Sequence, residues 1–349
     1  MSVRQENIAL GDPLSEHELC PDELLAGQEA AFARDIARLH GRVTEFVTVG
    51  CPACGRTNQN KIFEKVGFSF QSCTQCATVY MSPRPSPAVL ADYYENSENY
   101  DYWAKYIFPA SEAVRREKIH KPWLERVIGF CDRHTIRRDT LLEIGAGFGT
   151  FAAVAKQSSA FERVIAIEPT PEMAAACRSR GVEVIEKRIE EVGSEPGSVD
   201  VAVAFEVIEH LFDPSIFLKK CAHLLNPGGL LVVSCPNGLG FDIATLGVKA
   251  LAVDAEHVNL FNPSSLTHLL ARCDFEVLEV TTPGRLDAEF VREAALRCEI
   301  DLSESPFLNR VLIDEWDKLG APFQRFLAEN GLSSHMWAAA RRKSELARD

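Results

Sequence analysis

The chain has 349 residues, a length that provides one large or two modest domains with a substantial core. Its 37 basic and 50 acidic side chains give a formal net charge of −13, which disfavours a nucleic-acid partner unless basic residues gather on one face. No apolar stretch approaches the roughly 20 residues that span a bilayer, and we recognise no secretory signal, so we expect a cytoplasmic protein.

Residues 1–45 predict a polar leader followed by a helix. The helix carries an apolar stripe, which favours packing against the rest of the chain over a partner site. The residues of this stripe are Leu24, Leu25, Ala31, Phe32, Ile36 and Leu39.

Two cysteine pairs lie in the next segment, residues 46–82. Cys51 and Cys54 form one pair, and Cys73 and Cys76 form the second after eighteen intervening residues. This spacing is typical of structural zinc, because both thiolates of a pair can reach one ion and four thiolates complete a tetrahedron. The chain between the pairs can fold back as a hairpin. A disulfide or redox role is disfavoured, because the other cysteines are scattered along the chain.

Residues 83–130 predict a connector and an aromatic helical lid. The connector starts from a proline-rich run at 82–87, which cannot continue a helix. Residues 92–106 then hold six aromatic side chains among polar ones. Such side chains cover ligands well, because they bury area and still form hydrogen bonds. We expect this segment to lie over a cofactor or acceptor pocket, and packing of a linker helix on the core is the alternative.

A glycine-rich turn opens the predicted core domain, residues 131–285. A buried strand runs into glycines at Gly145, Gly147 and Gly149, where the backbone must lie directly against a ligand. Dinucleotide-binding folds require G-x-G-x-x-G, and Thr150 occupies the position of their third glycine. The turn therefore argues against a nicotinamide or flavin cofactor.

Two carboxylates accompany this turn. Glu143, at the end of the strand, would repel a pyrophosphate but suits the cationic amino-acid end of S-adenosylmethionine. Glu168 closes the next strand, on the order of 20 residues past the glycines, where a ribose-binding acid is expected.

Apolar strand-length runs alternate with helical segments through the rest of the core, which predicts a mostly parallel sheet covered by helices. Residues 286–330 are too long for a bare loop and have helical spacing, so we expect a helical insertion that forms a lid or a dimer surface. Residues 331–349 hold the last strand and a tail. The further runs of the core are at 182–185, 199–205, 229–234 and 275–280.

The fourth strand ends in an E-x-x-E-H run that comprises Glu206, Glu209 and His210. It lies at the carboxyl edge of the predicted sheet, where open α/β folds bind ligands. His257 follows farther along the chain and is a candidate general base, since an imidazole near its ordinary pKa is matched to this task. The alternative is a purely structural role, in which the two glutamates only order the loop and cap the next helix.

The run E-x-G-x-G-x-G, together with Glu168, resembles the first motif of class I S-adenosylmethionine-dependent methyltransferases. The resemblance implies an α/β fold with a Rossmann-like, mostly parallel sheet whose last strand is antiparallel, here with an N-terminal zinc-ribbon-like module and a helical insertion before the last strand. It also implies S-adenosyl-L-methionine as the cofactor. The expected cofactor-binding residues are Glu143, Gly145, Ala146, Gly147, Gly149, Glu168, Ile189, Phe205 and Glu206.

The E-x-x-E-H run with a later histidine resembles ubiquinone-pathway O-methyltransferases and the methyltransferases that modify small-RNA ribose ends. In those relatives such residues hold a divalent metal beside the acceptor hydroxyl. The resemblance implies a second metal at Glu206, Glu209, His210 and His257. We name His257, His210 and Glu209 as candidate catalytic residues, with His257 acting as base or as metal ligand.

The order of segments resembles bacterial small-molecule methyltransferases of sugar, surface-glycan and natural-product pathways. We therefore predict methyl transfer to a hydroxyl of a small metabolite by an enzyme that could form homo-oligomers. Two alternatives stay open. One is an RNA methyltransferase whose zinc module grips RNA, which the acidic balance disfavours, and the other is a non-catalytic cofactor-binding scaffold.

Overall fold

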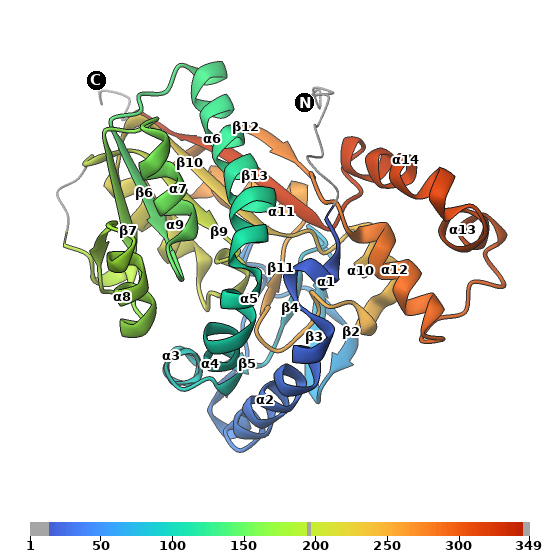
Figure 1. The fold of residues 1–349 in the computed structure, drawn as a ribbon. Helices are drawn as coiled ribbons and strands as arrows, with labels where there is room; N and C mark the ends of the chain where they lie inside the picture. The colour runs from blue at the N-terminus through green and yellow to red at the C-terminus, as the bar shows by residue number, and fades with distance from the viewer. Residues whose placement is uncertain (1–13, 194–196, 345–349) are drawn as a thin grey trace.

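A seven-stranded sheet forms the centre of the computed structural model, which describes residues 14–193 and 197–344 (Figure 1). The strands are β6 (Thr140–Ile144), β7 (Arg163–Ile167), β8 (Glu183–Ile185), β9 (Val199–Phe205), β10 (Leu225–Pro236), β12 (Phe275–Thr281) and β13 (His335–Arg342). Their spatial order is β12-β13-β10-β9-β6-β7-β8. β13 is antiparallel to both of its neighbours, and the other pairs are parallel. The predicted fold class is confirmed.

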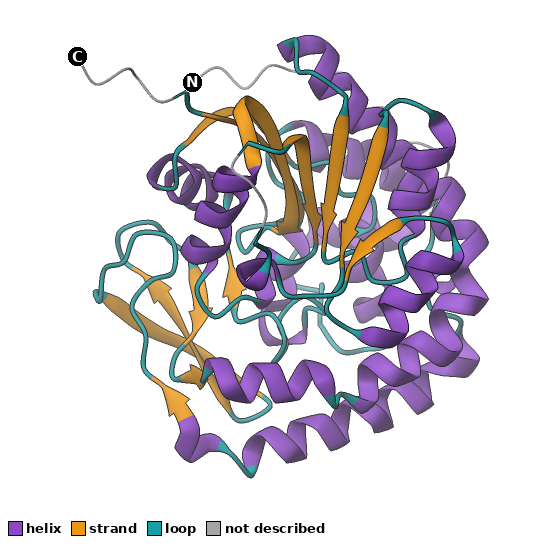
Figure 2. Cartoon of the chain, turned by 90° about the vertical axis from the view of Figure 1, so that its left-hand side faces the viewer, coloured by secondary structure: helices purple, strands orange, loops and turns teal. Residues whose placement is uncertain are grey.

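Helices cover both faces of this sheet, as Figure 2 shows. Successive residues of β6 illustrate why, because Leu141 and Leu142 point to opposite faces and both are buried. Leu141 packs in the cluster formed by α6, α7 and α8, and Leu142 in the cluster formed by α9 and α11. These helices are α6 (Lys121–His134), α7 (Thr150–Ser158), α8 (Pro171–Ser179), α9 (Pro214–Leu224) and α11 (Pro263–Arg272). No helix in the described part of the chain is long and apolar enough to cross a bilayer.

A helical run from Glu98 to His134 passes along the molecule, and two π-helical turns interrupt it. Each π turn directly precedes a segment whose second residue is proline, Pro109 or Pro122. Proline lacks an amide hydrogen and clashes with the preceding turn, so the helix widens there. The segments are α4 (Glu98–Tyr102), η2 (Trp103–Ile107), α5 (Phe108–Arg115), η3 (Arg116–His120) and α6.

The N-terminal helices pack beneath this run. The predicted helix is present as α2, with Ala31, Ile36 and Leu39 buried along its stripe. Asp35, also buried, accepts hydrogen bonds from the Ser97 hydroxyl and the Asn99 amide at the start of α4. The bounds are α1 (Glu16–Leu19), α2 (Asp22–His40) and α3 (Pro87–Glu95), with a short turn η1 (Val43–Glu45).

The cysteine-containing segment folds as the predicted hairpin, and a strand from the core pairs with it to complete a small sheet. The four-stranded sheet has the order β11-β4-β3-β2. Its strands are β2 (Gln59–Lys65), β3 (Phe68–Cys73), β4 (Val79–Met81) and β11 (Asn259–Leu260). A two-stranded pair, β1 (Phe46–Val47) with β5 (Arg84–Pro85), flanks it. Cys51, Cys73 and Tyr80 share one buried cluster with β6 and β9, so this segment is packed into the main core.

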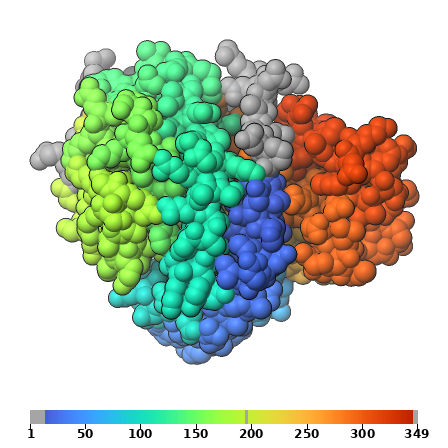
Figure 3. All heavy atoms as spheres, viewed as in Figure 1, coloured from blue at the N-terminus to red at the C-terminus, as the bar shows by residue number. Residues whose placement is uncertain are grey.

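The expected helical insertion lies between β12 and β13. Its helices are α12 (Asp287–Leu296), α13 (Pro306–Asn309) and α14 (Trp316–Glu329), with a π turn η7 (Arg310–Asp314). α12 packs on α14 and on α10 (Phe241–Leu246). In Figure 3 the orange and red atoms of the insertion form a lobe beside the blue N-terminal helices.

Arg84 ties the cysteine segment to the core from a position with no solvent exposure. Its guanidinium donates to Asn259 Oδ1 at 2.8 Å and to the backbone oxygens of Met81, Phe212 and Val258 at 3.0, 3.2 and 3.1 Å. Burial lowers the pKa of Arg84 to about 10.

The Arg84→Met variant is expected to lower the free energy of unfolding by about 3–5 kcal/mol, because the buried acceptors of Arg84 would lose their donor. Denaturant titration measures this change. Arg56→Met is the matched control, because Arg56 lies on the same segment and is exposed. An equal loss of stability in both variants would contradict the role of Arg84.

Candidate active site and metal centre

The glycine-rich turn joins β6 to α7, and its three glycines have different surroundings. Gly145, Gly147 and Gly149 have φ angles of +73°, +54° and +70°, a region that other residues rarely adopt. A Cβ on Gly145 would lie 2.7 Å from Val207 Cγ2, and one on Gly149 would lie 2.6 Å from Cys177 Sγ. A Cβ on Gly147 would meet no atom within 4 Å. Two glycines therefore permit close packing, and Gly147 faces open space.

Glu168 lies beside this turn, as predicted from its position after β7. Its carboxylate accepts hydrogen bonds from the amides of Gly147 at 2.8 Å and Thr170 at 2.9 Å. Burial raises the pKa of Glu168. A ligand seated on Gly147 would therefore meet this carboxylate.

Glu143 points toward α7. It accepts a hydrogen bond from the amide of Ala152, in the first turn of the helix, at 2.9 Å. A carboxylate at this end of a helix is stabilised by the helix dipole. Burial raises the pKa of Glu143 to about 8. In this structure Glu143 orders the helix that follows the turn, a role the sequence analysis did not assign to it.

Three apolar residues were also predicted to contact the cofactor. Ala146 lies within the turn and packs against the core cluster of α6 and α7. Ile189 is buried among core residues in a short turn, Ile189–Glu191. The Phe205 ring packs 4.7 Å from Trp123 and 5.0 Å from Trp337, measured between centroids. Their contact with a cofactor stays a prediction.

Glu206 follows β9 with an unusual φ of +54°. Its Oε1 accepts hydrogen bonds from Ser234 Oγ at 2.5 Å and from His335 Nε2 at 3.0 Å. Burial alone would raise the pKa of Glu206, but His335, when it is protonated, and the hydrogen bonds from His335 and Ser234 outweigh burial and lower the pKa to about 2. Glu206 is therefore ionised.

Glu209, His210 and His257 form a second cluster, in which one ligand atom from each residue lies within 4.8 Å of the others. Glu206 was expected as a fourth member, and the structure corrects this, because its side chain is paired with Ser234 and His335 instead. The Glu209 side chain has no solvent exposure, and its oxygens have no hydrogen-bond partner in the described residues. A buried carboxylate in this state needs a compensating charge.

The histidine tautomers suit a metal. His210 Nδ1 lies 3.2 Å from the Glu256 carbonyl oxygen, and His257 Nδ1 lies 2.9 Å from that of Ala252. A carbonyl oxygen only accepts, so each Nδ1 carries a proton, and Nε2 is the ring nitrogen that can bind a cation once it is unprotonated. Metal-binding histidines commonly have such a backbone partner.

Burial and charge act differently on the ionisable groups of this cluster. Burial lowers the pKa of His210 to about 3, which keeps this ring neutral. Burial also acts to lower the pKa of His257, but the charges of Asp254 and Glu209 outweigh it and raise the pKa to about 9. His257 therefore holds a proton at neutral pH when the cluster lacks a cation. The proposal of His257 as a general base assumed a pKa near the ordinary value of histidine, and the raised pKa differs from that value.

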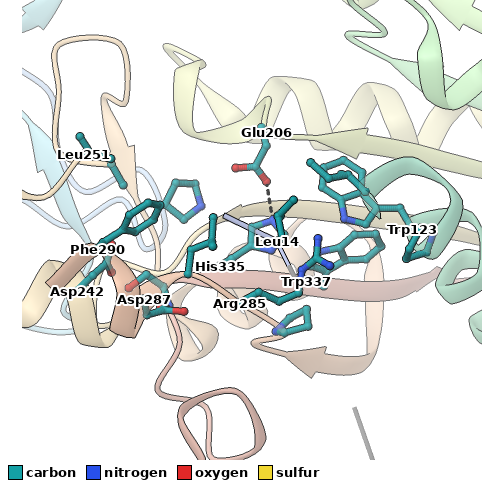
Figure 4. Close-up of a pocket in the computed structure, with 18 of the residues that line it drawn as sticks. Leu14, Trp123, Glu206, Asp242, Leu251, Arg285, Asp287, Phe290, His335 and Trp337 are labelled. Carbon is teal, nitrogen blue, oxygen red and sulfur yellow. Dashed lines mark hydrogen bonds and ion pairs between the residues drawn. The ribbon is translucent and has the colours of Figure 1, made fainter. Parts of the chain in front are cut away.

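A cavity of about 560 Å³ opens beside this region (Figure 4). Aromatic side chains from four elements line it, namely Trp103, Trp123, Trp337 and Phe290. Phe290 belongs to α12, so the helical insertion contributes one wall, as expected of a lid. The polar side chains of the wall are Arg126, Glu206, Asp242, His257, Arg285, Asp287, Ser334 and His335.

The aromatic segment at 92–106 divides its side chains between two environments. Trp103 reaches the cavity. The Tyr93 hydroxyl donates to Glu256 Oε1 at 2.5 Å, and the Tyr94 ring centroid lies 5.9 Å from that of His210. These two side chains therefore pack next to the cluster of Glu209, His210 and His257. Both expected roles, covering a pocket and packing on the core, are therefore present.

The sequence analysis missed four residues of this region. His335 and Trp337 alternate along β13 and both reach the cavity, a period of two that was visible in the sequence. Asp242 and Asp287 lie in α10 and α12, which no motif marked.

The four cysteines predicted to bind zinc come together at one end of the small sheet. Cys51 Sγ lies 3.5 Å from Cys76 Sγ, Cys54 Sγ lies 3.6 Å from Cys73 Sγ, and no disulfide joins them. Sulfurs bound to one zinc at about 2.3 Å lie about 3.8 Å apart, so the cluster has the dimensions of a tetrathiolate site.

Comparison with known proteins gives the family. A family model for a methyltransferase domain matches residues 114–280. The chain is 36% identical over 141 residues to a Mycobacterium tuberculosis protein named "Probable S-adenosylmethionine-dependent methyltransferase", covering 39% of this chain and 48% of that one. It is 31% identical over 187 residues to the ubiquinone biosynthesis O-methyltransferase of Xylella fastidiosa, covering 50% of this chain and 68% of that one.

The chain belongs to the S-adenosylmethionine-dependent methyltransferases. It spans about half the length of the mycobacterial relatives. Among solved structures, the 1,6-didemethyltoxoflavin-N1-methyltransferase of Burkholderia thailandensis is similar with a TM-score of 0.46 and 14% identity, covering 82% of this chain and 100% of that one.

We expect the Cys54→Ser and Cys76→Ser variants each to lose about one zinc per chain and to unfold more easily, because a structural zinc contributes directly to folding. Metal analysis and thermal unfolding measure both effects. Cys298→Ser is the control, since Cys298 is exposed and outside the cluster. A wild-type protein that contains no zinc would contradict the assignment.

Proposed function

We propose that this protein transfers a methyl group from S-adenosylmethionine to a hydroxyl of a small metabolite, such as a sugar, a glycan precursor or a phenol. One observation carries the proposal. The cavity of about 560 Å³ reaches Glu206, and the next residue, Val207, lies against Gly145 of the glycine-rich turn. A molecule in the cavity would therefore lie beside a cofactor held by the turn.

The cofactor would be held by the open side of the turn. Gly147 presents a bare backbone, and Glu168 presents a carboxylate that can accept hydrogen bonds from both ribose hydroxyls. A bulky group at Gly147 would occupy the space that the ligand needs.

Glu209, His210 and His257 would hold a divalent cation. Such an ion, when bound, acts as a Lewis acid that lowers the pKa of a coordinated hydroxyl. The unpartnered carboxylate of Glu209 and the Nδ1–H tautomers of the two histidines support this role.

A small acceptor fits the site better than RNA does. Trp103, Trp123 and Trp337 contribute apolar walls, and apolar pockets with few polar groups are typical of small-molecule sites. The O-methyltransferase name of the Xylella relative supports a hydroxyl acceptor. The net charge of −13 disfavours a long polyanion.

The Gly147→Val variant is expected to weaken binding of S-adenosylmethionine by at least about tenfold, a loss of about 1.4 kcal/mol, because the side chain fills the cofactor space. Isothermal titration calorimetry measures the affinity. Gly228→Val is the matched control, since Gly228 also has positive φ and open space but lies near the opposite end of β10. If the wild type gives no heat with the cofactor or its demethylated product, the proposed function fails.

The acceptor class is tested by formation of S-adenosylhomocysteine with 3,4-dihydroxybenzoate, free hexoses and nucleotide-linked hexoses. We expect turnover with at least one of them. Chelation that leaves zinc bound should reduce turnover, and Mn²⁺ should restore it. His257→Ala should lower kcat by about 100-fold, equal to about 3 kcal/mol of lost transition-state stabilisation.

The exposed His223 provides the control variant, His223→Ala, which should keep wild-type turnover. Near wild-type activity of His257→Ala would remove both chemical roles of that residue. Folded, cofactor-binding protein that methylates no acceptor would favour the scaffold alternative, and methylation of an RNA oligonucleotide alone would favour the RNA alternative.

A further inference from the structure

We propose that His335, oriented by Glu206, is the catalytic residue that accepts the proton of the acceptor hydroxyl. The proposal rests on the proposed function and adds to it a residue that neither the motifs nor the metal cluster includes. His335 begins β13 and lines the cavity together with Glu206.

The pair lies at the point where the cavity approaches the cofactor turn. Glu206 follows β9 directly, and the adjacent Val207 side chain fills the space beside Gly145. The Glu206 amide donates to the Ser234 backbone oxygen at 3.1 Å, which helps to hold the uncommon backbone conformation of Glu206. Residues kept in such conformations are often found at active sites.

The hydrogen bonding fixes which ring nitrogen of His335 is available. An ionised carboxylate only accepts hydrogen bonds, so Glu206 receives the Nε2 proton of His335 at 3.0 Å. In the neutral ring the lone pair then lies on Nδ1. Across residues 14–193 and 197–344, the bond to Glu206 is the one hydrogen bond recorded for this ring. A carboxylate also fixes the histidine tautomer in hydrolase triads, where it accepts from Nδ1–H and Nε2 is the base, so the two nitrogens have exchanged places here.

Aromatic packing holds the ring in place. The Trp123 ring lies 6.1 Å from the His335 ring with an angle of 20° between their planes, and Trp337 lies 6.3 Å away, nearly perpendicular. The His335 side chain remains 28% exposed, in accord with its place on the cavity wall (Figure 4). A fixed ring that opens onto the cavity can meet a bound hydroxyl.

The other histidine of the cavity wall is less suited to this task. His257 donates its Nδ1 proton to Ala252, and the ring is a member of the cluster with Glu209 and His210. Both of its nitrogens therefore have functions in the cation site. His335 is outside that cluster.

The reaction balances with this assignment. His335 accepts the hydroxyl proton on Nδ1 as the acceptor oxygen forms its bond to the methyl carbon. The bond from that carbon to the sulfonium breaks, and its electron pair stays on sulfur. The imidazolium that results is stabilised by the negative charge of Glu206 and returns its proton to solvent after the product leaves.

The first test needs no acceptor. In nitrogen-15 histidine NMR spectra of the full chain, assigned with His335→Gln, His335 should be the Nε2–H tautomer with an unprotonated Nδ1. Glu206→Gln should change this tautomer signal. A wild-type ring that carries its proton on Nδ1 would overturn the proposal.

The second test uses an acceptor from the panel above. His335→Gln should lower kcat by about 10²- to 10⁴-fold, the range for loss of a general base, while cofactor affinity and zinc content stay unchanged. Added imidazole should partly restore turnover by His335→Ala. Unchanged kcat in His335→Gln would also overturn the proposal.

His134→Gln is the matched control, because His134 also pairs with a carboxylate, Glu279 at 2.6 Å, and does not line the cavity. It should keep wild-type turnover, and an equal loss in both variants would count against a specific role of His335. If the wild type methylates nothing on the panel, the proposed function fails, and the tautomer measurement still decides the arrangement of His335.

Discussion

One buried side chain, Asn259, holds the turn at residues 206–211, which carries Glu206, Glu209 and His210. Its amide group donates to the backbone oxygens of Ile208 and Glu209, each at 3.3 Å, and of Leu211 at 2.7 Å. Its oxygen accepts from Arg84. Asn259 lies only two residues after His257 and belongs to β11, which pairs with β4 of the cysteine segment. The two halves of the proposed cation site and the cysteine segment are thus held to one another by a continuous set of hydrogen bonds.

The same turn holds two glutamates in different environments. Glu206 has hydrogen-bond donors and a low pKa, whereas burial without partners raises the pKa of Glu209 well above its ordinary value. Environments that separate the pKa values of neighbouring carboxylates are typical of sites where they have different tasks. Here Glu206 faces a histidine on the last strand, and Glu209 faces a place suited to a cation. In the mechanism that we propose, proton transfer and metal binding would therefore be separated by three residues of this turn.

Short sequence patterns predicted the features of this protein that depend on residues close together in the chain. The glycine-rich turn, the cysteine pairs and the alternation of strands with helices each depend on spacing within a short stretch of sequence, and the structure has all three. The pairing of Glu206 with His335 joins residues 129 positions apart, and no local pattern encodes such a contact. β11 is only two residues long, so it has no periodicity that could be recognised. The hydrogen bond from the Ala152 amide to Glu143 was not predicted for a related reason, because this contact forms only when the turn has folded.

The position of β13 has a consequence for how the protein is made. This strand is inserted between β10 and β12, both of which precede it by more than fifty residues in the chain, and it carries the cavity residues His335 and Trp337. During translation, the glycine-rich turn and the Glu209 cluster can leave the ribosome long before the strand that completes the acceptor wall. Because β13 also contributes Met336, Ala338 and Ala340 to the core, the sheet is complete only after this strand has been added, and pairing over such long distances makes its insertion a slow step.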